Sequence, residues 1–194
     1  MSDFLTDVAT LRARAREHID QGPITAADGA DRNRVVEVLN EALATEIVCV
    51  LRHRRHFYTA TGITVGPVAA EFLQHANEEL AHADRIAMRI VQLQGSPNFD
   101  PASLTDRSHS EFDASDDLIE MIQEDLVAER VAIASYSDVI RWLGDEDETT
   151  RRLLEDILAM EEEYADHLLN LLTDLHTPSL SRMRGEADPC SASR

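Results

Sequence analysis

The sequence predicts an all-α protein: a four-helix bundle with one long crossover connection, preceded by a short N-terminal helix. Four long segments place apolar residues three and four positions apart, as amphipathic helices do. Only 5% of the 194 residues are aromatic, and the seven glycines and six prolines are few for a β-rich chain. The connections between the long segments are short, long and short, which is the pattern of a bundle with a single crossover.

Each element follows from local signals along the chain. Residues 3–20 predict a short amphipathic helix, and the glycines and proline of residues 21–30 predict a linker. The long helices are expected at residues 31–60, 66–95, 114–144 and 147–175. Residues 95–113 contain two prolines and are expected to connect the second and third of these helices without helical structure. The predicted domains are an N-terminal extension with a short helix (1–30), a helical bundle (31–176) and a disordered tail (177–194).

Composition limits the partners of the chain. The 37 acidic and 18 basic residues give a formal net charge of −19. Such an acidic chain is a poor candidate for nucleic-acid binding, because phosphates require a basic surface, but it attracts small cations. No apolar run approaches the ~20 residues that cross a bilayer, the N-terminus lacks a signal-peptide core, and Cys49 and Cys190 form no metal-binding pair. We therefore expect a soluble, cytoplasmic protein with no nucleic-acid or membrane partner.

The apolar face of every long helix contains a carboxylate near its middle: Glu46, Glu79, Glu129 and Glu161. Helix packing brings these positions to one level, where an unpaired buried carboxylate costs several kcal/mol unless a cation is bound. His82 follows Glu79 by one turn on the same face, and carboxylates with histidine are ligands for iron or manganese. Two divalent ions about 3.5–4 Å apart would satisfy four carboxylates. The competing interpretation is that the apolar faces are misphased and the glutamates are surface charges.

Four segments resemble bacterioferritins and related ferritin-like proteins: Asn40–Glu46, Glu78–Asp84, Asp125–Glu129 and Ile157–Glu163. The resemblance covers about residues 33–175 and implies a ferritin-like fold with a diiron site inside one subunit. By this resemblance Glu46 and Glu129 are each the one ligand that their helix supplies. Glu79 with His82, and Glu161, come from the two helices that carry the Glu-x-x-His motif of the family. The implied activity is that of a ferroxidase, in which O₂ or H₂O₂ oxidises two Fe(II) and Fe(III) is stored inside a shell of subunits.

Three positions depart from the family pattern. Tyr164 stands where the fourth helix has a ligand histidine, so it is a candidate metal ligand, a hydrogen-bond donor beside the site, or a space-filling residue. His167 is an alternative ligand one turn further on, and slower iron oxidation is expected in either case. Leu80 replaces the methionine that binds haem between two subunits, so no haem is expected. His53 replaces a tyrosine near the site.

Other candidates favour structural interpretations. His75, one turn before Glu79, is expected to be a hydrogen-bonded core histidine, with an auxiliary metal site as the alternative. The arginines of Arg52–His56 are expected to pair with neighbouring helices or subunits, with a phosphate or other partner as the less favoured alternative. Cys49 is expected to be a small core residue.

Two other functions compete with ferroxidase activity. One is peroxide reduction at a diiron or dimanganese centre, as in rubrerythrin-like proteins, although the chain lacks the paired Cys-x-x-Cys module that such proteins often carry. The other is a metal-binding bundle whose catalysis is weak or absent because of Tyr164. The resemblance implies a homo-oligomer built from dimers, and a cage is one of the assemblies that the sequence leaves open.

Overall fold

The computed structural model describes residues 6–17, 19, 30–60 and 66–176. Helix α1 is Val8–Arg14, α2 is Arg32–Thr59, α3 is Gly66–Gln92, α5 is Leu118–Leu143 and α6 is Glu148–His176. Two short turns lie between α3 and α5: the 3-10 turn η2 (Pro101–Ser103) and helix α4 (Leu104–Arg107). The described parts of the chain contain no strand. The all-α fold class is confirmed.

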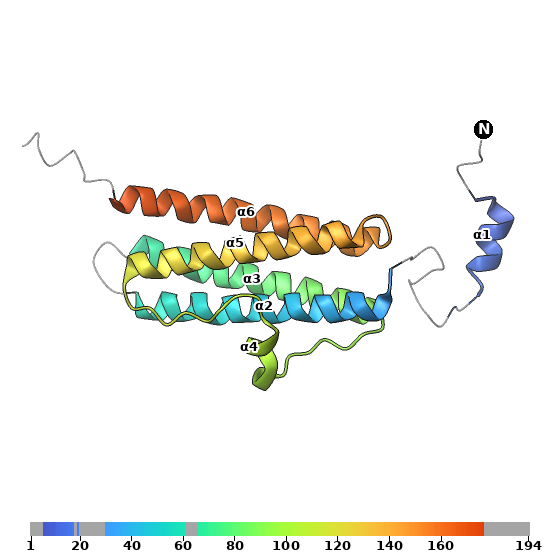
Figure 1. Cartoon of the computed structure of the whole chain (residues 1–194), viewed down its shortest axis with the longest axis horizontal. Helices are drawn as coiled ribbons and strands as arrows, with labels where there is room; N and C mark the ends of the chain where they lie inside the picture. The colour runs from blue at the N-terminus through green and yellow to red at the C-terminus, as the bar shows by residue number, and fades with distance from the viewer. Residues whose placement is uncertain (1–5, 18, 20–29, 61–65, 177–194) are drawn as a thin grey trace, which may run out of the picture.

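The four long helices pack as two hairpins, α2 with α3 and α5 with α6, which lie alongside each other in one bundle (Figure 1). Asp31 and Asp117 cap the first helix of each hairpin, each accepting hydrogen bonds from two backbone amides of the first turn. The predicted bundle with one crossover is therefore correct. Helix α5 begins later than predicted, at Leu118, because Asp117 is its cap.

The crossover between the hairpins is more ordered than the sequence predicted. The expectation of no helix between residues 95 and 113 is wrong, because η2 and α4 form there, with Pro101 at the favourable first position of η2. Hydrogen bonds attach this segment to the outside of α2: the Asn98 amide donates to Asn40 Oδ1 (2.7 Å) and the His109 amide to Thr45 Oγ1 (2.9 Å). The crossover therefore covers α2 (Figure 1).

Gly95 permits the crossover to start against α2. A Cβ atom at this position would lie 2.6 Å from a Val36 methyl group, a separation that real Cβ atoms do not reach. The Gly95 amide also donates to the carbonyl of Ile90 (2.8 Å), and Gln94 just before it has a positive φ of 59°. Helix α3 ends at Gln92 for this reason, three residues before the predicted end.

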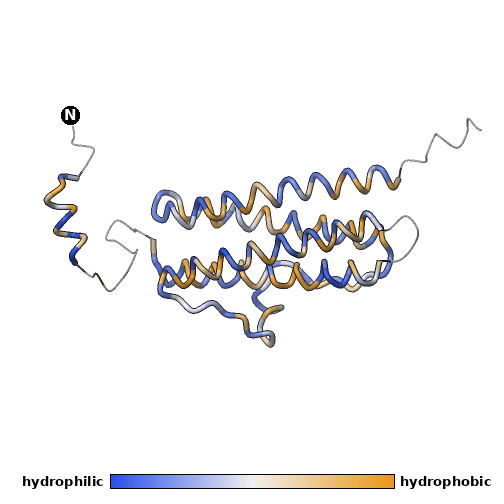
Figure 2. The backbone as a smooth tube through the Cα atoms, turned by 180° about the vertical axis from the view of Figure 1, so that it is seen from behind, coloured by the Kyte–Doolittle hydropathy of each residue, from blue (hydrophilic) through white to orange (hydrophobic). Residues whose placement is uncertain are grey.

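Two apolar clusters lie at opposite ends of the bundle, and a third, smaller one packs Leu104 of α4 against α2. One end cluster contains Leu43, Ile86 and Ile157, and the other contains Phe72 and Leu168. Along each long helix, hydrophobic and hydrophilic positions alternate with the helical repeat, as Figure 2 shows. The buried glutamates and histidines of the long helices lie in the layer between these two end clusters, so apolar packing encloses that layer from both ends.

Several predictions concern segments at the ends of the bundle. Helix α1 is shorter than expected, and its residues have no buried side chains and no contacts with the other described helices. The expected linker (21–30), apart from Ala30, the turn at residues 61–65 and the tail (177–194) lie outside the described residues, as does Cys190. The division into three domains stays a prediction.

A buried ion pair ties α2 to α5. Arg52 Nε lies 2.8 Å from Asp125 Oδ1, and the two side chains are 2% and 0% exposed. Asp125 Oδ2 also accepts a hydrogen bond from His56 Nδ1 at 3.0 Å. Burial raises the pKa of the Asp125 carboxyl, but His53, His56 and Arg52 outweigh burial and leave that pKa below its ordinary value. The arginine-rich segment thus pairs with a helix of its own chain, as the sequence predicted.

We expect Asp125→Ala to lower the free energy of unfolding by about 3–5 kcal/mol, because it leaves the Arg52 guanidinium buried without its partner. The matched control is Asp116→Ala, which removes the exposed partner of Arg55 and should cost less than about 1 kcal/mol. Urea unfolding in the presence of a chelator measures both. Equal losses in the two variants would contradict the importance of the buried pair.

Candidate metal centre

The four glutamates singled out in the sequence meet at the middle of the bundle. Glu46 lies on α2, Glu79 on α3, Glu129 on α5 and Glu161 on α6, and none of them is more than 2% exposed. Their apolar neighbours along each helix are buried too, so the predicted faces are correctly phased. The competing interpretation as surface charges is therefore wrong. Of the three consecutive glutamates at residues 161–163, only Glu161 is buried, and residues 162 and 163 are exposed.

One group of ligand atoms contains Glu46, Glu79, His82 and Glu161, all within 4.8 Å of one another. His82 Nδ1 faces the carboxylates, 3.0 Å from Glu161 Oε1 and 3.4 Å from Glu46 Oε2. Its other ring nitrogen, Nε2, contacts the Met160 sulfur at 3.4 Å. Three oxygens and one nitrogen thus surround one point in the bundle.

A second group contains His75, Glu79, Glu129 and Glu161, again within 4.8 Å. His75 Nε2 lies 3.2 Å from Glu79 Oε1 and 3.4 Å from Glu129 Oε1. Glu79 and Glu161 belong to both groups, and each has two carboxylate oxygens to share. The arrangement is that of two ion positions bridged by two carboxylates.

The ligand atoms lack the partners that buried polar atoms normally have. Within the described parts of the chain no hydrogen bond reaches Glu46 Oε2, Glu129 Oε1, either oxygen of Glu161, His75 Nε2 or His82 Nδ1. All of these atoms belong to residues of the two ligand groups. A donor set of buried carboxylate oxygens and imidazole nitrogens fits a pair of divalent transition-metal ions.

Burial governs the electrostatics of the carboxylates and histidines. Desolvation raises the pKa of the Glu46 carboxyl, and together with the neighbouring carboxylates it raises the pKa values of Glu79 and Glu161 well above the ordinary value. Burial acts the same way on Glu129, but the adjacent His75 outweighs it and lowers the Glu129 pKa. The His75 pKa rises well above its usual range, because Glu129, Glu78 and Glu79 outweigh burial. The raised pKa values of Glu79 and Glu161 show that negative charge at this level is costly without a cation.

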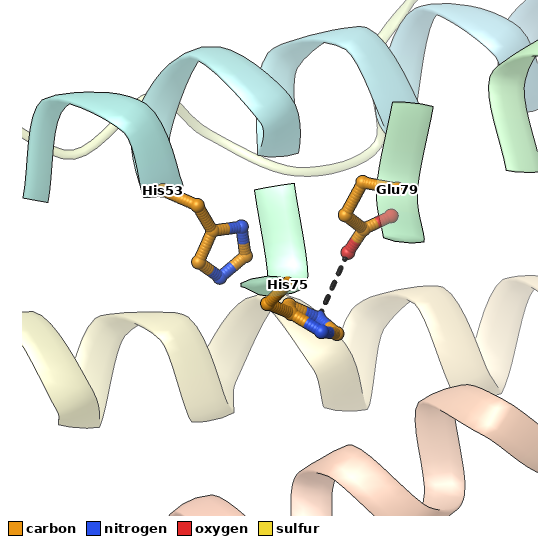
Figure 3. Close-up of side chains that lie close together, drawn as sticks. All are labelled: His53, His75 and Glu79. Carbon is orange, nitrogen blue, oxygen red and sulfur yellow. Dashed lines mark ion pairs between the residues drawn. The ribbon is translucent and has the colours of Figure 1, made fainter. Parts of the chain in front are cut away.

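His53 lies beside this centre on α2, at the edge of the His75 ring (Figure 3). Its Nδ1 donates to the Cys49 carbonyl at 2.9 Å, which leaves Nε2 without a proton in the neutral ring. Burial lowers the His53 pKa to about 4, so the ring is neutral near pH 7. His53, His75 and Glu79 also form a group of close ligand atoms, which shares two members with the second ion position.

Two tyrosines complete the surroundings. The Tyr136 hydroxyl donates to Glu46 Oε1, a contact that the sequence analysis did not predict. Tyr164 is buried and stacks on the His75 ring with 15° between the planes. Its hydroxyl has no hydrogen-bond partner among the described residues. The sequence correctly placed Tyr164 at the centre, but not its stacking on His75.

The other sequence candidates lie further out. His167 Nε2 is 3.5 Å from Glu71 Oε2 and is a member of none of the ligand groups, and Leu80 is 39% exposed. Two buried residues near the centre were not predicted in these roles. The sequence analysis favoured His75 as a core histidine and did not single out Asp125. The signal for each was its spacing, four residues before a candidate ligand on the same helix face.

A cavity of about 240 Å³ between α3 and α6 reaches the centre from outside. His75, His82 and Tyr164 line its inner part, and the partly or fully exposed Glu78 and Glu163 are at its rim. Acidic side chains therefore border the approach to both ion positions.

No helix in the described ranges is long and apolar enough to cross a membrane.

A four-helix bundle whose core holds carboxylates and histidines arranged for two ions is the architecture of the carboxylate-bridged dimetal proteins. The family model of the ferritin-like domain matches residues 36–177. The chain therefore belongs to the ferritin-like family, as its sequence motifs indicated.

Related proteins have similar sequences and folds. A bacterioferritin of Brucella melitensis is 28% identical over 138 residues, which make up 70% of this chain and 80% of that protein. The structure of a dodecameric thioferritin of Bacteroides fragilis, a bacterioferritin-related protein, has a TM-score of 0.73 at 30% identity, over 80% of this chain and 90% of that one. The Desulfovibrio desulfuricans bacterioferritin, determined with its diiron site in different catalytic states, has a TM-score of 0.65 at 24% identity, over 84% and 94%.

We expect Glu161→Gln to stabilise the metal-free protein at neutral pH by on the order of 1 kcal/mol. Because the Glu161 pKa is raised on folding, the wild-type protein loses stability as the pH rises above the ordinary value of 4.5. The advantage of the variant should therefore grow with pH and vanish below about pH 4. Urea unfolding across this range, in a chelator, measures the effect.

The control is Glu162→Gln, which changes an exposed carboxylate next to Glu161 and should leave stability unchanged at every pH. A Glu161→Gln protein that is less stable than wild type at neutral pH would contradict the electrostatic account.

Proposed function

We propose that this protein oxidises Fe(II) to Fe(III) at the carboxylate–histidine centre and stores or detoxifies the iron. The observation that carries the proposal is the convergence of unpartnered buried ligand atoms from four helices on two adjacent positions. A bundle built for stability alone would have apolar side chains there, since burying four carboxylates opposes folding.

In this proposal the glutamates hold and neutralise two Fe(II) ions as substrate. Glu79 and Glu161 bridge both ions, while Glu46 and Glu129 each bind one, and His82 binds the ion beside Glu46. Tyr136 donates a hydrogen bond to Glu46 and so fixes the orientation of that carboxylate. Each Fe(II) gives up one electron. With H₂O₂ the two electrons and two protons yield two waters, and with O₂ they yield one H₂O₂.

Electrostatics support the delivery of cations to this site. The net charge of −19 attracts divalent ions, and the cavity between α3 and α6 has acidic residues at its rim and histidines inside. We propose this cavity as the entrance for Fe(II). We propose iron as the metal, and no haem at position 80, because a leucine side chain offers no donor atom.

Tyr164 favours one alternative function, a metal-binding bundle with weak or no catalysis. The fourth helix lacks the histidine of the family pattern, and the Tyr164 hydroxyl has no hydrogen-bond partner in the described segments. Metal analysis and turnover measured on the same sample distinguish the two functions. Iron that is bound stoichiometrically and never oxidised would favour the alternative.

We further propose that the chain assembles into a cytoplasmic homo-oligomer built from dimers. A related protein of Bacteroides fragilis is dodecameric. Large apolar side chains also lie on the outside of the bundle, including Met88 and Val91 on α3 and Trp142 on α5, which are 49–63% exposed. Such side chains are typical of surfaces that pack against another subunit.

Glu79→Ala is expected to abolish rapid Fe(II) oxidation, because it removes a carboxylate shared by both ion positions. The matched control, Glu162→Ala, removes an exposed carboxylate and should keep the wild-type rate. Stopped-flow absorbance in the ultraviolet, after aerobic or peroxide addition to anaerobically loaded protein, measures the rate. Equal rates in wild type and Glu79→Ala would refute the proposed function.

We expect the native mass to be a multiple of a dimer. Native mass spectrometry and light scattering of the purified chain, whose monomer is 21.7 kDa, test this expectation. A closed shell would support storage. A monomer in solution would contradict the proposed assembly and restrict the function to oxidation without storage.

A further inference from the structure

We propose that the second ion of this centre takes its nitrogen ligand from His75 on α3, and not from α6. The proposal rests on the function proposed above and specifies one ligand of it. In the family pattern this nitrogen comes from the fourth helix, at the position that Tyr164 occupies here. Glu79, Glu129 and Glu161 supply the oxygens of the same ion position.

The orientation of His75 is that of a metal ligand. Its Nδ1 lies 3.2 Å from Glu78 Oε2, and because a carboxylate only accepts, Nδ1 is the protonated nitrogen. Its Nε2 therefore points inward, 3.2 Å from Glu79 Oε1 and 3.4 Å from Glu129 Oε1. Histidines that bind metals usually donate their other ring N–H to a carboxylate or carbonyl, which fixes the ring. Glu78 has this orienting role.

Packing holds the His75 ring in this orientation. The ring of Tyr164 stacks on it. His53 meets its edge, with 4.7 Å between ring centroids and 87° between planes; Figure 3 shows the two imidazoles side by side. His75 is only 2% exposed. Its imidazole is thus fixed on three sides, by an aromatic ring, a second imidazole and the Glu78 carboxylate.

The two competing nitrogen or oxygen donors on α6 fit less well. His167 is paired with Glu71 on the outer side and belongs to none of the ligand groups. Tyr164 lies parallel to the His75 ring, and in this position its ring supports the imidazole. The tyrosine therefore positions His75, and His75 on α3 supplies the nitrogen ligand that a histidine on α6 supplies in the family pattern.

Helical geometry allows one helix to supply both nitrogen ligands. His75 precedes Glu79 by four residues and His82 follows it by three, so all three side chains lie on one face of α3. Each imidazole then binds a different ion, and Glu79 bridges between them. The two nitrogens differ: His82 presents Nδ1 and His75 presents Nε2.

Zn(II) binding to the assembled, metal-free protein tests this assignment without depending on catalysis, because Zn(II) is redox-inert. We expect two Zn(II) per chain in the wild type by calorimetry. His75→Ala should keep the Zn(II) at the His82 position and lose or strongly weaken the other. Glu78→Gln should weaken the second Zn(II) roughly 10- to 100-fold, as loss of an orienting carboxylate does.

Two further variants remove the competing donors on α6. Tyr164→Phe deletes only the phenol oxygen, and His167→Ala deletes the other imidazole, so both should still bind two Zn(II). Zn(II)-soaked crystals should place one anomalous peak about 2.0–2.1 Å from His75 Nε2. The protein loaded with Fe(III) should lack the visible absorption of an iron–phenolate bond.

The outcomes distinguish the possible failures. Loss of the second Zn(II) in Tyr164→Phe or His167→Ala, with both ions retained in His75→Ala, would overturn the assignment of His75 and leave the proposed function intact. A wild-type protein that binds no Zn(II) and no Fe(II) would refute the proposed function itself. Circular dichroism and native mass identify a His75→Ala protein that does not fold, and in that case the partly exposed Glu78→Gln variant decides.

Discussion

The whole structure depends on one constraint: four carboxylates are buried at one level of a helical bundle. Isolated negative charges in a protein interior are costly, and like charges repel one another as well. Imidazoles on the adjacent turns of α3 and a tyrosine that donates to Glu46 offset part of this cost. Among the described residues, these contacts do not compensate the buried carboxylates fully, and bound cations would. The functional interpretation follows from this need for cations.

The helical bundle and five candidate ligands could be predicted because both follow from periodicity. Glu46, Glu79, Glu129 and Glu161 interrupt apolar faces at regular spacing, and His82 shares the face of Glu79. The helical turns of the crossover could not be predicted in this way. They depend on contacts with α2, such as the bond from Asn98 to Asn40, that only the folded chain brings together.

His75 shows a different limit of sequence reasoning. Its position on the helix face was visible, but a histidine on such a face is more often a hydrogen-bonded core residue than a ligand. The choice depends on which nitrogen points inward, and Glu78 and Tyr164 determine that only in three dimensions. Asp125 was also missed: its spacing before Glu129 was visible, but its partners Arg52 and His56 lie on another helix. Long-range pairing of charges has no periodic signature.

The two apolar clusters at opposite ends of the bundle have a consequence for how metal and folding are linked. In small zinc domains the ion holds the chain together, and removal of the ion unfolds it. Here the clusters containing Ile86 and Phe72 close the bundle on both sides of the polar layer, independently of any ion. The scaffold can therefore lose and regain bound ions while its backbone stays folded.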